Sequence, residues 1–357
     1  MNKYKCAIMK YKNMKKIIAL LVVVITLSVG GFIFYSYSTQ KKDIDIPSIL
    51  QKSSFKFSNL ISNKKQSTPP IRHVFVILEE NHDWSSIYKN PEAAYINNTL
   101  LKGGAYASNY RNVPLSYGEL HPSELNYIFL EAGQISFPDH TFSTDNDPSL
   151  QNSTSYQLHL VSLLEKGGYT WKSYQESISG DGCPIKSTGN YAAKHNPFVY
   201  FQDVVGNPPS SENTYCKDHI RPLSELQNDL NTGNVANYVF ITPNLQHDMH
   251  NGTIAQGDAW LANTVPQIIN SKTFKQDGAL FITWDEGSEQ DNNPQQQNNP
   301  IGMIMLSPYI KPGFTNNTEY SHASLVKTIE KIFALNPLLG LAKDPNVKDL
   351  FDFFVQN

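Results

Sequence analysis

Four short and uninterrupted apolar runs constrain the fold of this 357-residue chain more than any other feature. A run that is apolar throughout, rather than at every second position, is typical of a strand covered on both faces. Helical stretches separate the runs, and this alternation indicates an α/β domain with a mostly parallel central sheet flanked by helices. The runs are His73–Leu78, Tyr238–Thr242, Ala279–Thr283 and Met303–Leu306, and the expected helices are Leu125–Leu130, Tyr156–Lys166, Ala259–Asn270 and Ser324–Leu335.

Polar and ionisable side chains follow three of these runs at the point where each run ends. The first run leads into Glu79–His82, the second into His247–His250, and the third into Asp285 and Glu286. Ligands bind beyond the carboxyl ends of the strands in open α/β sheets, so these clusters are expected to meet at one edge. One cluster alone would read as a solvated loop, whereas three indicate a site. Carboxylate and amide oxygens suit a divalent cation, and imidazoles widen the choice toward zinc or iron.

A candidate nucleophile, Ser123, lies just before the expected helix Leu125–Leu130. Free amides and the helix dipole favour a phosphate at such a position, and Asn126 could offer its amide to the same anion. The simpler interpretation is that Ser123 only caps the helix. The sequence has no GxSxG nucleophile elbow, Walker A loop, HExxH or CxxC motif.

The first 70 residues are expected to be a targeting segment followed by a tether. Six lysines precede Ile17–Tyr35, a charge-free apolar run of 19 residues, about the length needed to cross a bilayer core. The alternative is a secretory signal, whose apolar region is usually roughly 7–15 residues, cleaved near Ser36 or Ser38 and releasing a secreted body. We predict a cytoplasmic basic segment (1–16), a transmembrane anchor or signal (17–37), a polar tether (38–70) and one exported domain (71–357), at the cell surface or in the periplasm.

The charge of the body argues against a nucleic-acid partner, and its cysteines agree with export. Residues 1–42 hold eight lysines and no acid, so the rest of the chain carries a net charge of −11. An acidic body lacks the basic groups that sequence-independent nucleic-acid binding requires, and no nucleic-acid partner is expected. Cys183 and Cys216 are the two cysteines beyond the apolar run, and an oxidising compartment favours a disulfide between them over two buried thiols.

Six segments, in this order, resemble the bacterial phosphoesterase family of acid phosphatases and phospholipases C, within the alkaline-phosphatase-like superfamily. The resemblance covers essentially all of Ile71–Leu341, and the ordered set of motifs is more specific than any single one. Around Ser123 the family commonly reads Ser-Leu-Pro-Asn-Tyr, whereas this chain reads Ser-Glu-Leu-Asn-Tyr. The segments are Val76–Trp84, His121–Gly133, Tyr191–Phe201, Ile241–Leu261, Phe281–Gly287 and Tyr320–Leu335.

The resemblance implies an alkaline-phosphatase-like fold and a metal site. Because His250 is two residues from Asp248, rather than four as in the two-metal enzymes, we expect one divalent metal of unknown identity. The implied metal ligands are Glu80, Asn81, Ser123, Asp285 and Glu286.

The resemblance also implies catalytic roles. Ser123 is the implied nucleophile and Asn126 the contact to the phosphoryl group. His250 or His322 would protonate the leaving group or bind phosphate, and Asp248 falls in the same phosphate-facing region. The residues left open between catalytic and structural roles are Asp248, His195, His82, His121, His247 and Asp258.

We therefore expect a metal-dependent hydrolase of phosphate esters that works through a phosphoserine and resembles acid phosphatases. One alternative is a phospholipase C that acts on phospholipid headgroups. Another is a surface-binding module that kept the fold and lost turnover, although a decayed enzyme would be expected to lose one of the implied ligands. The expected partners are a phosphate-ester substrate and, through the N-terminal helix, a membrane.

Overall fold

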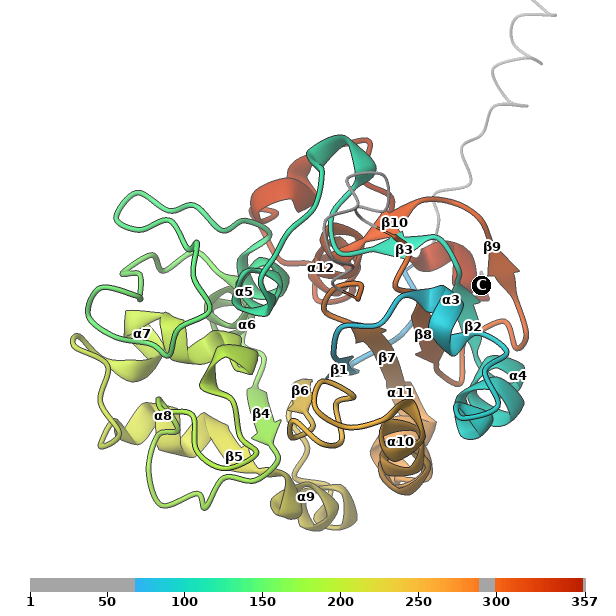
Figure 1. Ribbon diagram of the computed structural model, residues 1–357, viewed down its shortest axis with the longest axis horizontal. Helices are drawn as coiled ribbons and strands as arrows, with labels where there is room; N and C mark the ends of the chain where they lie inside the picture. The colour runs from blue at the N-terminus through green and yellow to red at the C-terminus, as the bar shows by residue number, and fades with distance from the viewer. Residues whose placement is uncertain (1–67, 289–298, 356–357) are drawn as a thin grey trace, which may run out of the picture. The chain divides into compact units, whose positions relative to one another are not determined.

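The computed structural model describes residues 68–288 and 299–355, and their centre is an eight-stranded sheet (Figure 1). The strand order is β5-β4-β6-β1-β7-β8-β2-β9, and the first five strands of this order are parallel. β8 pairs antiparallel with both β7 and β2. The strands are β1 (His73–Glu79), β2 (Ala105–Ala107), β4 (Trp171–Gln175), β5 (Ile220–Pro222), β6 (Tyr238–Thr242), β7 (Gly278–Trp284), β8 (Met303–Leu306) and β9 (Thr315–Asn316).

The four apolar runs form the middle of this sheet, as predicted. β1 pairs with β6 from Val74↔Tyr238 onward and with β7 from His73↔Gly278 onward. All residues of β6, β7 and β8 are buried, because helices cover both faces of the sheet. The prediction of an α/β domain with a mostly parallel sheet is confirmed.

Helices lie on the two faces of the sheet, with α5, α6 and α12 on one side and α9, α10 and α11 on the other (Figure 1). Tyr127 of α5 contacts Phe240 of β6, and Phe274 of α11 contacts Phe75 of β1. The helices are α3 (Trp84–Ile87), α4 (Leu101–Gly103), α5 (Ser123–Ala132), α6 (Leu160–Lys166), α7 (Gln202–Val205), α8 (Thr214–His219), α9 (Leu226–Thr232), α10 (Ile254–Ile269), α11 (Lys272–Asp277) and α12 (His322–Ile332).

Short elements complete the described chain. A two-stranded sheet pairs β3 (Tyr110–Arg111) with β10 (Tyr320–Ser321) in parallel. One π-helical turn is η1 (Ile96–Leu100), and the 3₁₀ turns are η2 (Leu115–Tyr117), η3 (Ala193–His195), η4 (Pro197–Tyr200), η5 (Leu223–Glu225), η6 (Gly340–Lys343) and η7 (Phe351–Phe353).

The structure begins α5 and α12 two residues before their predicted starts, and it shifts the starts of two other helices further. α10 begins at Ile254, five residues early, because Thr253 and Gln256 form a capping box there. Asp258, predicted as its cap, instead accepts hydrogen bonds from the backbone N–H groups of Tyr95 and Ile96. α6 begins at Leu160 rather than Tyr156, because His159 caps it.

The predicted basic segment (1–16), the membrane anchor (17–37) and most of the tether (38–70) lie outside the described residues. Among the helices of the described part, none combines the length and apolar character needed to cross a bilayer. Cys183 and Cys216 are buried and form the expected disulfide, with their Cα atoms 5.5 Å apart.

Candidate active site

Three strand ends bring the predicted carboxylates together at one edge of the sheet. Glu80 follows β1, Asp285 follows β7, and Asp248 lies in the loop after β6. The backbone N–H of Glu80 donates to the Asp248 carbonyl at 2.7 Å, and that of Asp285 donates to the Glu79 carbonyl at 2.9 Å. These bonds fix the three segments against one another, and the three acidic side chains are fully buried.

Asn81 joins Glu80 to Asp285. Its backbone has a φ of 48°, which asparagine tolerates better than most residues, and its N–H donates to Asp285 Oδ1 at 3.1 Å. The amide atom that faces the carboxylates lies 3.0 Å from Glu80 Oε2 and 3.2 Å from Asp285 Oδ1. As nitrogen, this atom donates to both carboxylates. As oxygen, it completes a set of three oxygens spaced like neighbouring ligands of a divalent cation.

Burial raises the pKa values of these carboxyl groups. Burial, followed by the charges of Asp285 and Asp248, holds the pKa of Glu80 well above its ordinary value. Burial also raises the pKa of Asp285 to about 7 and that of Asp248 to about 7. Oδ2 of each aspartate makes no hydrogen bond within the described residues. A divalent cation would neutralise the excess negative charge and could bind these two Oδ2 atoms. The donor set therefore fits a metal.

Helix α5 holds Glu80 by both carboxylate oxygens. Ser123 Oγ donates to Oε2 at 3.1 Å, and the Tyr127 hydroxyl, one turn later, donates to Oε1. Ser123 is the first residue of α5 and follows Pro122 at the N-cap position, so its hydroxyl faces the carboxylate and does not cap the helix. The simpler interpretation of Ser123 as a cap was therefore wrong.

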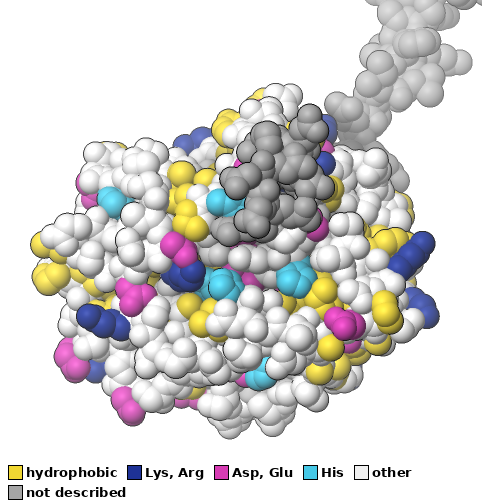
Figure 2. Space-filling view, in the orientation of Figure 1, with side chains coloured by type: hydrophobic (Ala, Val, Ile, Leu, Met, Phe, Trp, Pro, Cys, Tyr) yellow, Lys and Arg dark blue, Asp and Glu magenta, His cyan; other side chains and the backbone are white. Residues whose placement is uncertain are grey.

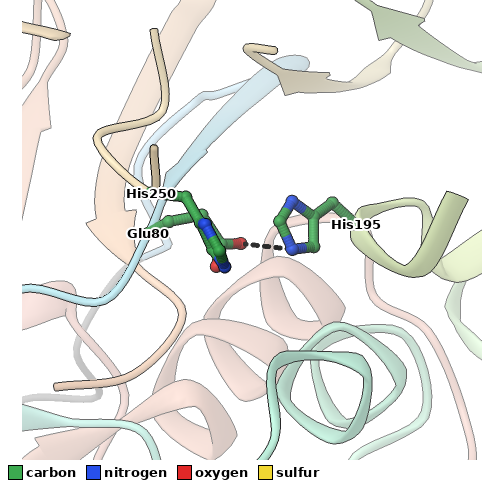
Figure 3. Close-up of side chains that lie close together, drawn as sticks. All are labelled: Glu80, His195 and His250. Atoms are coloured by element: carbon green, nitrogen blue, oxygen red, sulfur yellow. Dashed lines mark ion pairs between the residues drawn. The ribbon is translucent and has the colours of Figure 1, made fainter. Parts of the chain in front are cut away.

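Two histidines complete the cluster, and ligand atoms of Glu80, His195 and His250 lie within 4.8 Å of one another (Figure 3). His195 Nε2 lies 3.5 Å from Glu80 Oε1, and its Nδ1 lies 3.5 Å from Asp248 Oδ2. The His195 ring stacks on Tyr127 with 5.1 Å between ring centroids. Burial and the nearby Lys194 lower the pKa of His195 well below its ordinary value, so the ring is neutral and able to bind a cation. Histidine, acidic and basic side chains lie together near the centre of the face drawn in Figure 2.

Two predicted residues, Asn126 and Glu286, pair with each other beside this cluster. Asn126 Nδ2 donates to Glu286 Oε2 at 2.7 Å and to the Leu120 carbonyl at 2.9 Å. Glu286 also pairs with His121, whose pKa rises to about 9 because the contacts with Glu286 and Glu119 outweigh burial. Glu286 as a metal ligand therefore stays a prediction, and the contacts described here engage its Oε2 with Asn126 and His121.

His322 lies behind Asp285 and has both ring nitrogens in hydrogen bonds. Nε2 lies 2.7 Å from the Asp285 carbonyl, and Nδ1 lies 3.0 Å from the Tyr110 hydroxyl. Burial lowers the pKa of His322 to about 4. This arrangement fits a neutral imidazole that donates from Nε2 and supports the backbone of Asp285.

The other open histidines make local contacts. His82 Nδ1 lies 2.7 Å from the Asn81 carbonyl, and His247 pairs with Glu176. Sequence reasoning did not single out Tyr127 or Lys194 as functional residues. The signal for Tyr127 was its spacing of four from Ser123, which places both side chains on one helical face.

A model of the phosphoesterase family matches residues 88–336. The chain belongs to the phosphoesterase family. Membership confirms the resemblance and the predicted class, a hydrolase that acts on phosphate esters. Phosphatidylinositol-3-phosphatase of Mycobacterium tuberculosis is 31% identical, over 79% of this chain and 84% of that protein. A probable acid phosphatase of Kluyveromyces lactis is 26% identical, over 78% of this chain and 62% of that protein.

A solved structure supports the fold of this phosphoesterase family member. A protein of the alkaline phosphatase superfamily from Vibrio parahaemolyticus superposes with a TM-score of 0.50 at 10% identity. The superposition covers 76% of this chain and 68% of that one. The predicted alkaline-phosphatase-like fold is thereby supported.

Proposed function

We propose that this phosphoesterase hydrolyses phosphate monoesters, with Ser123 as the nucleophile and one bound divalent metal. The observation that carries the proposal is the hydrogen bond from Ser123 Oγ to the buried Glu80, beside Asn81 and Asp285. A hydroxyl at a helix N-terminus, next to a cluster of metal-ligand type, is suited to attack a phosphoryl group.

In the first half-reaction, Ser123 Oγ forms a bond to phosphorus and the bond from phosphorus to the leaving oxygen breaks. The serine proton passes to a base, and Glu80 Oε2 already accepts that hydrogen. When bound, a divalent metal would lower the pKa of the serine hydroxyl and neutralise charge on the phosphoryl oxygens. Its holders would be Glu80, Asn81, Ser123 and Asp285, with His195 as a further donor at Glu80. Water then hydrolyses the phosphoserine.

The leaving group needs a proton, and we assign this step to His250 rather than His322. His250 is partly exposed beside the Glu80 cluster, so it can reach both a substrate and solvent. His322 is fully buried, and both of its nitrogens are used within the protein. Asn126 as the phosphoryl contact stays a prediction, because its amide nitrogen is bound to Glu286.

Both named relatives are phosphatases, which favours a phosphomonoester over the phospholipase C alternative. The full-length protein in detergent should be assayed against p-nitrophenyl phosphate, bis-p-nitrophenyl phosphate and phosphatidylcholine. Each assay should be run after chelation and after addition of Ca²⁺, Mg²⁺, Mn²⁺ or Zn²⁺. Metal-dependent turnover of the monoester supports the proposal. Preference for phosphatidylcholine would favour the phospholipase, and no turnover of any substrate would favour a binding module.

We also propose that the domain is exported and held at the membrane by residues 17–37. Support comes from the charge-free run, the lysines before it, and the disulfide between Cys183 and Cys216, which fits an oxidising compartment. Protease added to intact cells should remove the domain and leave a small N-terminal fragment. Intact protein in the cytosol would contradict the export proposal.

A further inference from the structure

A lysine–aspartate pair lies at the N-terminal end of α5, the helix that begins with Ser123 and is called the nucleophile helix below. Lys194 belongs to η3 and directly precedes His195, which contacts Glu80. Lys194 Nζ pairs with Asp145 Oδ2. The other oxygen, Asp145 Oδ1, accepts the backbone N–H of Glu124 at 3.3 Å, in the first turn of α5. The carboxylate therefore bridges a lysine and the helix end that begins with Ser123.

The Asp145 carboxylate is thus bound in the way that proteins bind anions. A helix N-terminus lies on one side of its two oxygens and an ammonium group on the other. A phosphoryl group attacked by Ser123 must come to the same helix end. The neighbouring Glu124 carboxylate is fixed within the protein, by residues on either side of Asp145 and by Asn152. That carboxylate accepts hydrogen bonds from Thr144, Asn152 and the backbone of Asn146.

The charge of Lys194 also acts on the proposed metal site. Burial alone would lower the pKa of Lys194, but its contact with Asp145 and the charges of Glu80 and Asp285 raise it. The side chains of Lys194 and Asp145 are 21% and 32% exposed, so a solute can reach both. A partly exposed ion pair contributes little stability, so exchanging one anion partner for another costs little.

We propose that Lys194 binds the phosphate of the substrate. In the free protein Asp145 occupies the position of that phosphate, and the phosphate displaces it on binding. The inference rests on the proposed phosphatase function. It adds Lys194 as a phosphate-binding side chain and Asp145 as a carboxylate that competes with phosphate for Lys194. The dianion of a phosphomonoester outcompetes a single carboxylate for Lys194 because it carries more charge and more acceptor oxygens.

The test uses the full-length protein, with p-nitrophenyl phosphate as substrate and inorganic phosphate as a competitive inhibitor. Lys194→Met should raise both KM and the phosphate inhibition constant at least ten-fold, the scale of one charge-assisted hydrogen bond, with a smaller change in kcat. Lys194→Arg should restore much of the loss. Asp145→Asn keeps an oxygen for the Glu124 N–H but removes the competing charge, so the phosphate inhibition constant should fall about three-fold or more.

Lys172 and Asp229 provide the control, because they form a lysine–aspartate pair on β4 and α9, with a partly exposed lysine and a buried aspartate. Lys172→Met should leave KM and phosphate inhibition within two-fold of wild type. If Lys194→Met behaves like Lys172→Met while wild type hydrolyses the monoester and is inhibited by phosphate, the inference fails and the function stands. If wild type neither turns over the monoester nor binds phosphate by calorimetry, both the function and the inference fail.

Discussion

Tyr127 donates its phenolic hydrogen to Oε1 of Glu80, so a tyrosine from the nucleophile helix fixes the orientation of a proposed metal ligand. Tyr127→Phe removes this hydrogen bond and keeps the ring that stacks on His195. We expect metal affinity to fall about 10–100-fold, as is usual when a hydrogen bond to a metal ligand is lost. Calorimetric titration of the metal into the chelated protein measures the change. Unchanged affinity in a folded variant would show that Glu80 is held well enough without Tyr127.

The second prediction concerns Ser123→Ala. The variant should fold and bind metal, because Glu80, Asn81 and Asp285 remain, but its rate should fall by orders of magnitude. Acid quench of wild type with substrate should trap phosphate on the peptide that contains Ser123. A folded variant with near-normal turnover would exclude Ser123 as the nucleophile and point to a water molecule.

The third prediction tests the proposed metal ligands. Glu80→Gln and Asp285→Asn each replace one negative oxygen, so metal content and activity should both fall while the fold persists. Metal analysis after dialysis, alongside circular dichroism, measures both effects. Glu225→Gln is the control, because it breaks a surface pair with Arg221 away from the site. Equal metal content in all three variants would place the metal elsewhere.

A buried ion network that joins α5, α6 and α7 makes stability depend on pH. His159 lies between Glu131 and Asp203, and these contacts outweigh burial and raise its pKa from 6.5 to about 9. A raised folded-state pKa adds stability that is complete below pH 6.5 and is lost as the pH rises through about 9. The shift corresponds to about 3 kcal/mol.

His159→Gln tests this linkage. The variant should unfold at a clearly lower temperature than wild type at pH 6.5, and the gap should narrow by pH 10. Thermal melts across this range measure the gap. A gap that is constant with pH would show that His159 contributes packing and not charge.

The fifth prediction concerns the disulfide. Cys183 and Cys216 are separated by 33 residues, and closing a loop of this length contributes roughly 3–4 kcal/mol in the chain-entropy model. Replacing both cysteines with serine should lower the melting temperature without changing KM. Peptide mass mapping without reductant should find the cross-linked pair in wild type, and two free thiols there would contradict it.

The sequence was informative wherever a pattern is local. β1, β6, β7 and β8 were predicted within one residue at each end, because a buried strand must be apolar throughout. Glu80, Asn81 and Asp285 were expected to meet, because parallel strands bring their carboxyl ends to one edge. α10 was misplaced because Asp258 resembles a cap, and its bond to the distant Tyr95 backbone has no sequence signal.

The parts of the site that depend on side-chain orientation could not be predicted. Glu286 directly follows Asp285, yet its carboxylate turns to Asn126 and His121. His250 and His322 were alternatives for the proton donor, and the sequence did not indicate that His322 contacts the backbone of Asp285. Spacing along the chain places a residue near a site, but the partners available in three dimensions decide which atom it offers.

The position of His322 has a consequence for how natural variation in this chain should be interpreted. The imidazole links Asp285 to Tyr110, and Tyr110 lies on the small β3–β10 ribbon, outside the main sheet. A change at Tyr110 would alter no reactive group, yet it would remove a bond from the ring that supports a proposed metal ligand. A homologue that lacks this tyrosine would therefore keep every proposed reactive group and still lose part of the support of Asp285.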